Sequence, residues 1–225
     1  MIGKCCGSSL ITKKAIVAAT GLVLAGFVLM HMLGNLLLFA GPQIYNTYSY
    51  KLTSNPALYL IEAVLLFAFV LHIFYATWLT KISRSARPIG YAVSPKGAKQ
   101  ATLAARTMIY QGAVLLAFII IHLETFKFGT HYEVTYDGIV MRDLYRLVIE
   151  VFASPEYVSW YVISMILLAT HLYHGVSSIF QSWGFNHPIY TPILKKVGVV
   201  YALGVGVGFL TNPIFAYIVA TGGNQ

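Results

Sequence analysis

The sequence predicts an all-α integral membrane protein, a single membrane domain of five transmembrane helices formed by residues 1–225. Hydrophobic residues make up 58% of the chain and charged residues only 10%, whereas soluble domains average about 25% charged residues. Five apolar runs each reach the roughly 20 residues that a bilayer span needs. They cover about residues 14–40, 57–80, 103–128, 157–183 and 194–220, so little of the chain is left for a soluble domain.

The ends of these spans are marked by charged or helix-breaking residues. Two lysines precede the first run, which is too long for a signal peptide and lacks a small-residue cleavage site, so we predict a retained helix. GPQ at 41–43 ends that run, and NPA at 55–57 opens the second. The longest connection, residues 129–150, is expected on the outer side, with a short surface helix over 140–152.

The basic residues are distributed unevenly along the chain. Fifteen Lys and Arg residues against seven Asp and Glu give a net charge of +8. Eleven basic residues flank one side of the predicted layout: Lys4, Lys13, Lys14, Lys81, Arg84, Arg87, Lys96, Lys99, Arg106, Lys195 and Lys196. The positive-inside rule therefore predicts a cytoplasmic N-terminus and an external C-terminus. Because topology explains the charge, we expect no nucleic acid partner, and docking of a cytoplasmic protein is a second use for the basic side.

The histidines carry the functional signal. His131 and His187 fall in predicted loops, where we expect solvated side chains. The other five lie within spans: His31 in the first, His72 in the second, His122 in the third, and His171 and His174 in the fourth. An ionisable residue inside a span is costly and indicates function by default. Four consecutive spans with such a residue indicate a shared site.

Counting along the helices at about 1.5 Å per residue separates these histidines into two depths. From the inner ends of their spans, His31 and His122 lie roughly 26 and 24 Å into the membrane. His72 and His171 lie roughly 14 and 18 Å from the inner ends of theirs. We therefore predict an outer pair and an inner pair, each made by imidazoles from two different helices.

Two imidazoles that face each other suit the axial ligation of a six-coordinate haem, and helix bundles commonly hold such groups. A macrocycle lying along its ligand helix needs small residues one turn away. Those present are Ala68 and Ala76 for His72, Gly175 for His171 and Gly34 for His31, with only Thr125 for His122. Zinc usually needs three or four ligands at one point. The pattern therefore predicts two haems, with a histidine proton relay as the remaining reading.

The fourth span has one histidine more than the pairing needs. His171 and His174 are three residues apart, so only one of them can be axial. Gly175 lies one turn from His171, which favours His171 as the ligand. His174 is then expected to be its neighbour, either hydrogen-bonded to a haem propionate or a quinone, or a polar residue inside the bundle.

Two other features are assigned no chemistry. Cys5 and Cys6 are adjacent, and neighbouring cysteines rarely form a structural disulfide. Gly204 and Gly208 in the fifth span form a small-xxx-small pattern, which predicts close helix packing and nothing more.

Four stretches of this chain resemble one family of membrane anchors. They are SSLITKKAIVAATGLVLAGFVLMHMLGNLLLF (8–39), NTYSYKLTSNPALYLIEAVLLFAFVLHIFYA (46–76), RSARPIGYAV (84–93) and HLYHGVSSIFQSWGFNHPIYTPILKK (171–196). They resemble the five-helix, diheme cytochrome b subunit of succinate dehydrogenase/fumarate reductase, the succinate:quinone oxidoreductase of respiratory complex II. The resemblance covers nearly the whole chain, including the spacing of its four helix-borne histidines.

The resemblance implies an electron-transfer role in the bacterial inner membrane. A flavoprotein subunit and an iron–sulfur subunit would dock on the cytoplasmic face and carry the dicarboxylate chemistry. Electrons would pass between the iron–sulfur clusters and a membrane quinone, typically menaquinone, by way of two b haems. The inner haem would take His72 and His171, and the outer haem His31 and His122. Lys13, Arg84 and Arg87 would be docking surface, propionate partners or plain topology charges.

The sequence departs from the family at one position. Some diheme members carry a membrane-buried Glu two residues before the fourth-helix ligand, where this chain has Ala169. A proton route through that residue is therefore not expected here. Glu62 and Glu124 lie towards the outer side, where they could serve a quinone site or reach the membrane interface, and we favour the interface.

Two other functions remain open at this stage. A diheme b-type anchor of another respiratory dehydrogenase, such as one for formate or hydrogen, would also place histidines on several spans. A haem-free transporter using histidine relays would be a different class, but it predicts broken helices in matching halves of the chain, which the sequence lacks.

Overall fold

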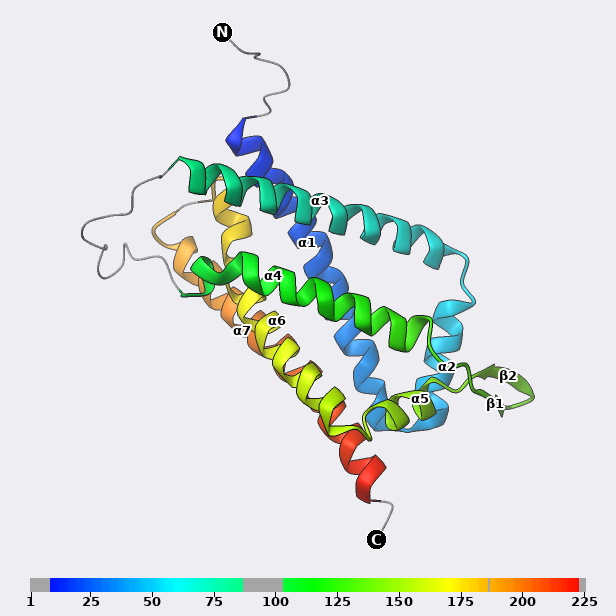
Figure 1. Ribbon diagram of the computed structural model, residues 1–225. Coiled ribbons are helices and arrows are strands. Elements are labelled where there is room, and N and C mark those ends of the chain that lie inside the picture. Colours follow the sequence, from blue (N-terminus) through cyan, green and yellow to red (C-terminus); the bar gives the residue numbers. More distant parts are fainter. Residues whose placement is uncertain (1–8, 87–102, 186, 223–225) are drawn as a thin grey trace.

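The computed structural model describes residues 9–86, 103–185 and 187–222. Cys5, Cys6 and Arg87 lie outside the described residues, as do Lys4, Lys96 and Lys99. Within these ranges the protein is an all-helical bundle with one short hairpin (Figure 1). The predicted fold class is therefore confirmed, and the chain is an integral membrane protein by the length and composition of its helices.

Five helices are long and apolar enough to cross a membrane within the described part of the chain. The first span is α1 (Leu10–Asn35), which continues as a 3₁₀ turn, η1 (Leu36–Ala40). The second is α3 (Ala57–Ser85). The third is α4 (Leu103–His122), which continues as a π-helical turn, η3 (Leu123–Lys127). The last two are α6 (Pro155–Ser182) and α7 (Tyr190–Gly222).

Helix starts follow the local sequence. The Ser9 hydroxyl accepts a hydrogen bond from the Thr12 N–H at the start of α1. The Ser154 hydroxyl caps α6 in the same way, and Pro155 follows at the first helical position, where a missing N–H has no cost. These caps satisfy backbone donors that would otherwise have no partner. They explain why both helices begin a few residues before the predicted apolar runs.

Small residues let the helices approach closely. A side chain added at Gly208 would collide with Met32 of α1, and one added at Gly206 would lie 2.8 Å from the Ala169 Cβ on α6. Gly204 has nothing comparable nearby. The predicted close packing is therefore present at Gly208 but not at Gly204. The role of Gly206 was not predicted.

A cap of three short elements covers one end of the bundle. It consists of α2 (Pro42–Thr53), the hairpin of β1 (Glu133–Tyr136) and β2 (Ile139–Arg142), and α5 (Leu144–Val151), which gather together in Figure 1. The surface helix expected over 140–152 is shorter, because its first residues belong to β2. Asp137 and Gly138 both have positive φ, which is the backbone of a tight two-residue hairpin turn.

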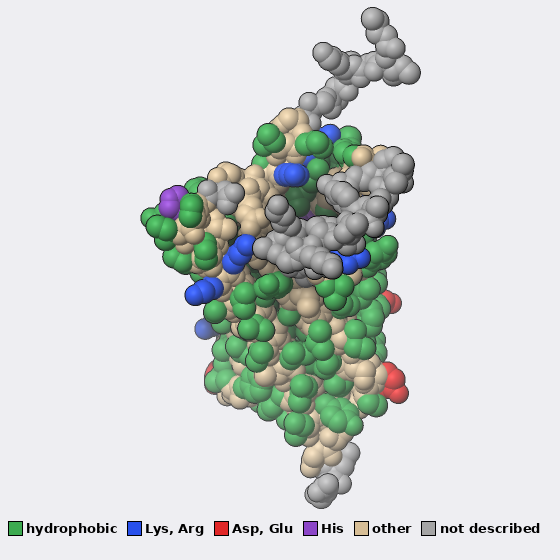
Figure 2. Space-filling model, turned by 90° about the vertical axis from the view of Figure 1, so that its left-hand side faces the viewer, with side chains coloured by type: hydrophobic (Ala, Val, Ile, Leu, Met, Phe, Trp, Pro, Cys, Tyr) green, Lys and Arg blue, Asp and Glu red, His purple; other side chains and the backbone are tan. Residues whose placement is uncertain are grey.

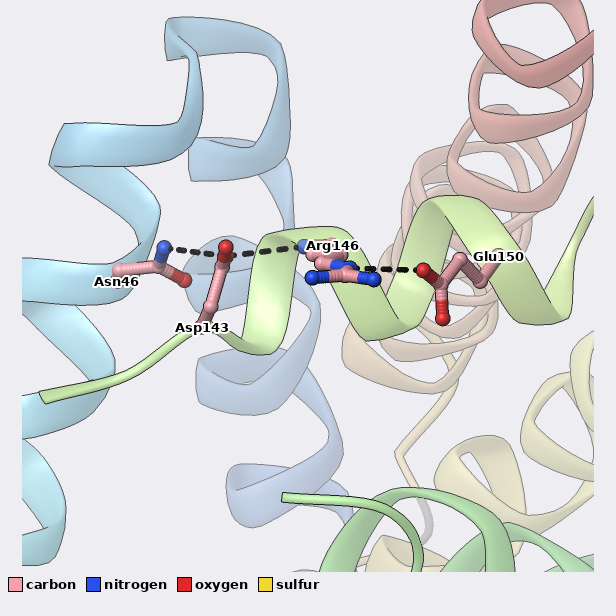
Figure 3. Close-up of polar contacts among 4 residues, drawn as sticks. All are labelled: Asn46, Asp143, Arg146 and Glu150. Atoms are coloured by element: carbon pink, nitrogen blue, oxygen red, sulfur yellow. Dashed lines mark hydrogen bonds and ion pairs between the residues drawn. The ribbon is translucent and has the colours of Figure 1, made fainter. Parts of the chain in front are cut away.

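A fully buried amide joins α2 to α5 (Figure 3). The Asn46 Nδ2 donates to Asp143 Oδ1 at 2.8 Å, and its Oδ1 accepts from the Tyr145 N–H at 2.9 Å. Asp143 also caps α5 by accepting from the Arg146 N–H. On the exposed side of α5, the hydrogen bond from Arg146 holds the pKa of Glu150 below its usual value. The cap is thus held by polar bonds as well as by apolar packing.

Charge separates the two ends of the bundle. The end where α1 begins and α3 finishes, here called the basic end, carries the described members of the basic group: Lys13, Lys14, Lys81, Arg84, Arg106, Lys195 and Lys196. All seven acids lie towards the capped end, here called the acidic end. Figure 2 shows most Lys and Arg side chains in the upper part of one face, the acidic ones lower, and a broad apolar band below the basic residues.

Candidate functional site: two histidine pairs

The acidic-end pair consists of His31 and His122. His31 comes from α1 and His122 is the last residue of α4, and their ring centres are 5.8 Å apart with planes nearly perpendicular. Two imidazoles that bind one metal ion from opposite sides, at metal–nitrogen distances of about 2 Å, have ring centres roughly 6 Å apart. The structure therefore brings together the two residues that depth counting assigned to the outer level.

Aromatic side chains surround the acidic-end pair. The His122 Nδ1 lies 3.1 Å from the Tyr161 hydroxyl, which leaves its Nε2 free of that bond. Tyr161 is buried against Phe118, Phe126 and Phe152, so the hydroxyl is held in place by packing. A hydrogen bond at the ring nitrogen that does not bind the metal fixes the orientation of a ligating imidazole. Phe152 follows α5 directly, so the cap element α5 borders this aromatic cluster.

The chain turns into a π-helix immediately after His122. The Phe128 N–H bonds to the Leu123 carbonyl, five residues back, instead of four. Single π-turns of this kind are frequent at functional sites. This turn ends at Lys127, which forms an ion pair with Glu62 of α3. Both side chains of the pair are partly exposed, and the interface role that we favoured for Glu62 stays a prediction.

The basic-end pair consists of His72 on α3 and His171 on α6. The His72 Nδ1 lies 3.2 Å from the Thr20 hydroxyl of α1. A Cβ added at Gly21 would lie only 3.3 Å from the His72 ring, so the imidazole rests directly on the α1 backbone. On the other side, a Cβ added at Gly112 of α4 would lie 4.0 Å from the His171 ring. Each imidazole of this pair therefore faces a glycine on a neighbouring helix.

His171 has no polar partner for its buried Nδ1 among the described residues. It lies within electrostatic range of both His72 and His174. His174 is half-buried one turn further along α6. It therefore lies beside His171, as predicted. Beside them, Gly175 faces open space, which agrees with the room predicted next to His171.

Two helices give the distance between the pairs independently. On α1, His31 lies ten residues after Gly21, which faces the His72 ring. On α4, His122 lies ten residues after Gly112, which faces the His171 ring. At the rise of an α-helix, both counts separate the two pairs by about 15 Å along the bundle. The two depths predicted from the sequence are therefore present in the structure.

The donor sets fit a cofactor that takes two imidazoles. No group of three or more His, Cys, Asp or Glu side chains converges anywhere in the described ranges. The His72 and His122 rings each use Nδ1 towards a hydroxyl, which leaves Nε2 for a metal. One expectation was wrong: the space beside Gly34 is filled by the Tyr48 side chain of α2, so it is not room for a macrocycle at His31.

Lys13 is a buried cation at the basic end. It is only 8% exposed, and its Nζ lies 4.4 Å from the centre of the Trp78 ring. All seven acids of the chain belong to the acidic end, so Lys13 has no carboxylate of this chain nearby. The positive charge of Lys13, on a side chain that is otherwise covered, would suit an anionic group from outside the polypeptide.

The remaining predicted residues lie away from the two pairs. His131 and His187 are exposed and lie outside the spans, as expected. Glu124 is exposed on the π-helical turn. Ala169 packs against Gly206 of α7.

Sequence reasoning missed the two hydroxyl partners, Thr20 and Tyr161, because a single Thr or Tyr inside a span has no distinctive pattern. Comparison of this chain with protein-family models, curated proteins and solved structures finds no match.

Proposed function

We propose that this protein is the membrane-anchor cytochrome b subunit of a succinate dehydrogenase/fumarate reductase. It would hold two b haems and pass electrons between an iron–sulfur subunit and a membrane quinone. One observation carries the proposal: two imidazole pairs, each drawn from two spans, lie about 15 Å apart along the bundle. The resemblance of the four sequence stretches to that family supports the choice of enzyme.

Four histidines would hold the cofactors. His72 and His171 would ligate the haem at the basic end, and His31 and His122 the haem at the acidic end. When bound, each haem would supply a one-electron carrier. The polypeptide would contribute the imidazole nitrogens that hold the iron, the orientation of two rings by the Thr20 and Tyr161 hydroxyls, and a largely apolar surrounding that keeps water away.

The basic end would face the cytoplasm by the positive-inside rule. Lys13 would pair with a propionate of the nearer haem, because its side chain is largely covered and forms no ion pair with the acids of the described residues. Arg84 and neighbouring basic residues would contact the iron–sulfur and flavoprotein subunits. Those subunits would carry the dicarboxylate chemistry, so this chain would be the quinone-side, electron-transfer part of the enzyme in a bacterial inner membrane.

The arrangement of the two pairs would couple the reaction to the membrane potential. Oxidation of succinate by a low-potential quinone such as menaquinone is unfavourable. An electron that moves from the basic end to the acidic end crosses part of the membrane field. A full crossing is worth about 2.3 kcal/mol per 100 mV. An uncoupler would then lower succinate:menaquinone activity in intact cells.

The test is purification of the complex from membranes by a tag on this chain. We expect a flavoprotein and an iron–sulfur protein to copurify, and anaerobic succinate to reduce the b haems. His72→Ala and His171→Ala should each block reduction of the acidic-end haem by succinate. Copurification of a formate dehydrogenase or a hydrogenase would overturn the choice of enzyme. A haem-free preparation that transports a solute would overturn the electron-transfer role.

A further inference from the structure

The His72 imidazole occupies a defined seat on helix α1. Its Nδ1 lies 3.2 Å from the Thr20 Oγ1. The next residue, Gly21, leaves the backbone bare under the ring, at a distance of 3.3 Å between the His72 Cε1 and a Cβ built at that position. Thr20 itself is only 8% exposed. The Thr20 hydroxyl therefore contacts the Nδ1 edge of the ring, and Gly21 lets the α1 backbone approach the ring closely.

The surroundings of Thr20 allow one direction for the hydrogen bond that suits a ligating imidazole. A threonine hydroxyl has one proton to donate. The Thr20 hydroxyl lies 2.8 Å from the Ile16 carbonyl and 3.1 Å from the Val17 carbonyl, and both of these groups can only accept. The backbone of α1 can therefore take this proton, which leaves the Thr20 oxygen able to accept from the His72 Nδ1–H.

In that arrangement the neutral imidazole carries its proton on Nδ1, facing α1, and its lone pair is on Nε2. That lone pair is the one a metal ion binds.

We propose that Thr20 and Gly21 form a seat that fixes the tautomer of His72 and directs its Nε2 to the haem iron at the basic end. Thr20 is thus a positioning residue, acting through His72. This inference rests on the proposed function, because it assigns a role towards the haem. It goes further by naming the residues that set the orientation and basicity of one axial ligand.

His171, the other histidine of the basic-end pair, has no equivalent of this seat. The His171 Nδ1 is buried without a polar partner among the described residues, and a Cβ built at Gly112 would lie 4.0 Å from the His171 Cε1, further than the 3.3 Å at Gly21. An acceptor on Nδ1–H makes an imidazole a stronger electron donor to its metal. The Thr20 bond therefore lowers the reduction potential of the basic-end haem, and this effect enters through His72 alone.

The test is a redox titration of the purified complex, followed by optical and low-temperature electron paramagnetic resonance spectra. Thr20→Val keeps the shape of the side chain and removes the acceptor. We expect the midpoint potential of one haem to shift upward and its resonance signal to change, with the other haem unaltered. Thr20→Ser keeps the hydroxyl and should retain the wild-type potential. Gly21→Ala should perturb the same haem, because the ring must move.

Thr80→Val is the matched control. The Thr80 hydroxyl is also part-buried and bonds to a backbone carbonyl of its own helix, that of Ala76. We expect wild-type potentials for both haems in this variant. If Thr20→Val removes the basic-end haem, or both haems, while Thr20→Ser keeps them, the seat is supported.

Three results would overturn the seat. They are unchanged potentials and signals in Thr20→Val, an equal loss in Thr20→Val and Thr20→Ser, or an equal shift in Thr80→Val. These results differ from a failure of the proposed function. In that case the wild-type complex would itself lack b-haem absorption.

Discussion

The polar joint between α2 and α5 gives a prediction that can be worked out from the structure. Asn46 is fully buried and bonds to both the Asp143 carboxylate and the Tyr145 N–H. Asn46→Ala removes the donor to the carboxylate and leaves the Tyr145 N–H without its partner. A hydrogen bond to a charged group contributes about 1.5–3 kcal/mol, and an unsatisfied buried donor costs about 1–3 kcal/mol. We therefore expect a local destabilisation of about 3–5 kcal/mol.

Hydrogen exchange of the α5 amides, measured by mass spectrometry on the protein in lipid nanodiscs, reports this local opening. Because each 1.4 kcal/mol is a factor of ten, exchange should accelerate at least about a hundredfold. Amides in the middle of α6 and α7 should keep their rates, since neither helix is held by this joint. Changes confined to the cap would show that the cap opens as a unit.

Gln43→Ala is the matched control for this prediction. Gln43 is also an amide side chain on α2, but its bond to Asp137 is exposed and long, at 3.4 Å. Its loss should change α5 exchange less than about threefold, because exposed polar contacts contribute little. If Asn46→Ala behaves like Gln43→Ala, the argument from burial and satisfied hydrogen bonds is wrong.

Three further predictions concern the pairs and the exposed face of α5. His122→Ala should remove only the acidic-end haem and His72→Ala only the basic-end haem, so each variant should retain one b haem by pyridine haemochrome assay. Tyr161→Phe removes a hydrogen bond to His122 worth about 0.5–1.5 kcal/mol. The reduction potential of the acidic-end haem should therefore rise by about 20–60 mV in a redox titration. An unchanged potential would show that the hydroxyl does not act on His122. The hydrogen bond from Arg146 holds the pKa of Glu150 below its usual value. The stabilisation of α5 by Glu150 is therefore present above the usual carboxyl pKa and is lost as the pH falls through the lowered pKa. Hydrogen exchange of the α5 amides should accelerate over that acidic range, and Glu150→Gln should abolish the acceleration.

The spans were predictable because membrane insertion imposes a strong compositional rule. Every predicted run coincides with one of the long helices to within a few residues at each end, and capping by Ser9 and Ser154 extends two of the helices beyond the start of their runs. The two histidine levels were predictable for a related reason. A straight helix converts residue number into depth, so His31 and His122 could be grouped before any contact was known.

Of the cap, only the short helix α5 was predicted; α2 and the hairpin were not, although their sequences contain usable signals. Asp137–Gly138 is a strong turn pair for a two-residue hairpin, and Pro42 after Gly41 is a typical helix start. Both signals were obscured by the polar composition of the segments, which favours loops. Thr20 and Gly34 illustrate a different limit. What lies opposite a small or hydroxyl residue depends on which helix packs there, and the sequence order of the helices does not determine this.

The central claim is that each histidine pair holds one b haem. The most direct measurement is a dithionite-reduced minus oxidised spectrum of the purified complex, with haem counted per copy of this chain. We predict two b haems per chain, each lost separately when its own pair is broken. A complex that contains no haem would contradict the claim, and one haem per chain would contradict the assignment of one of the two pairs.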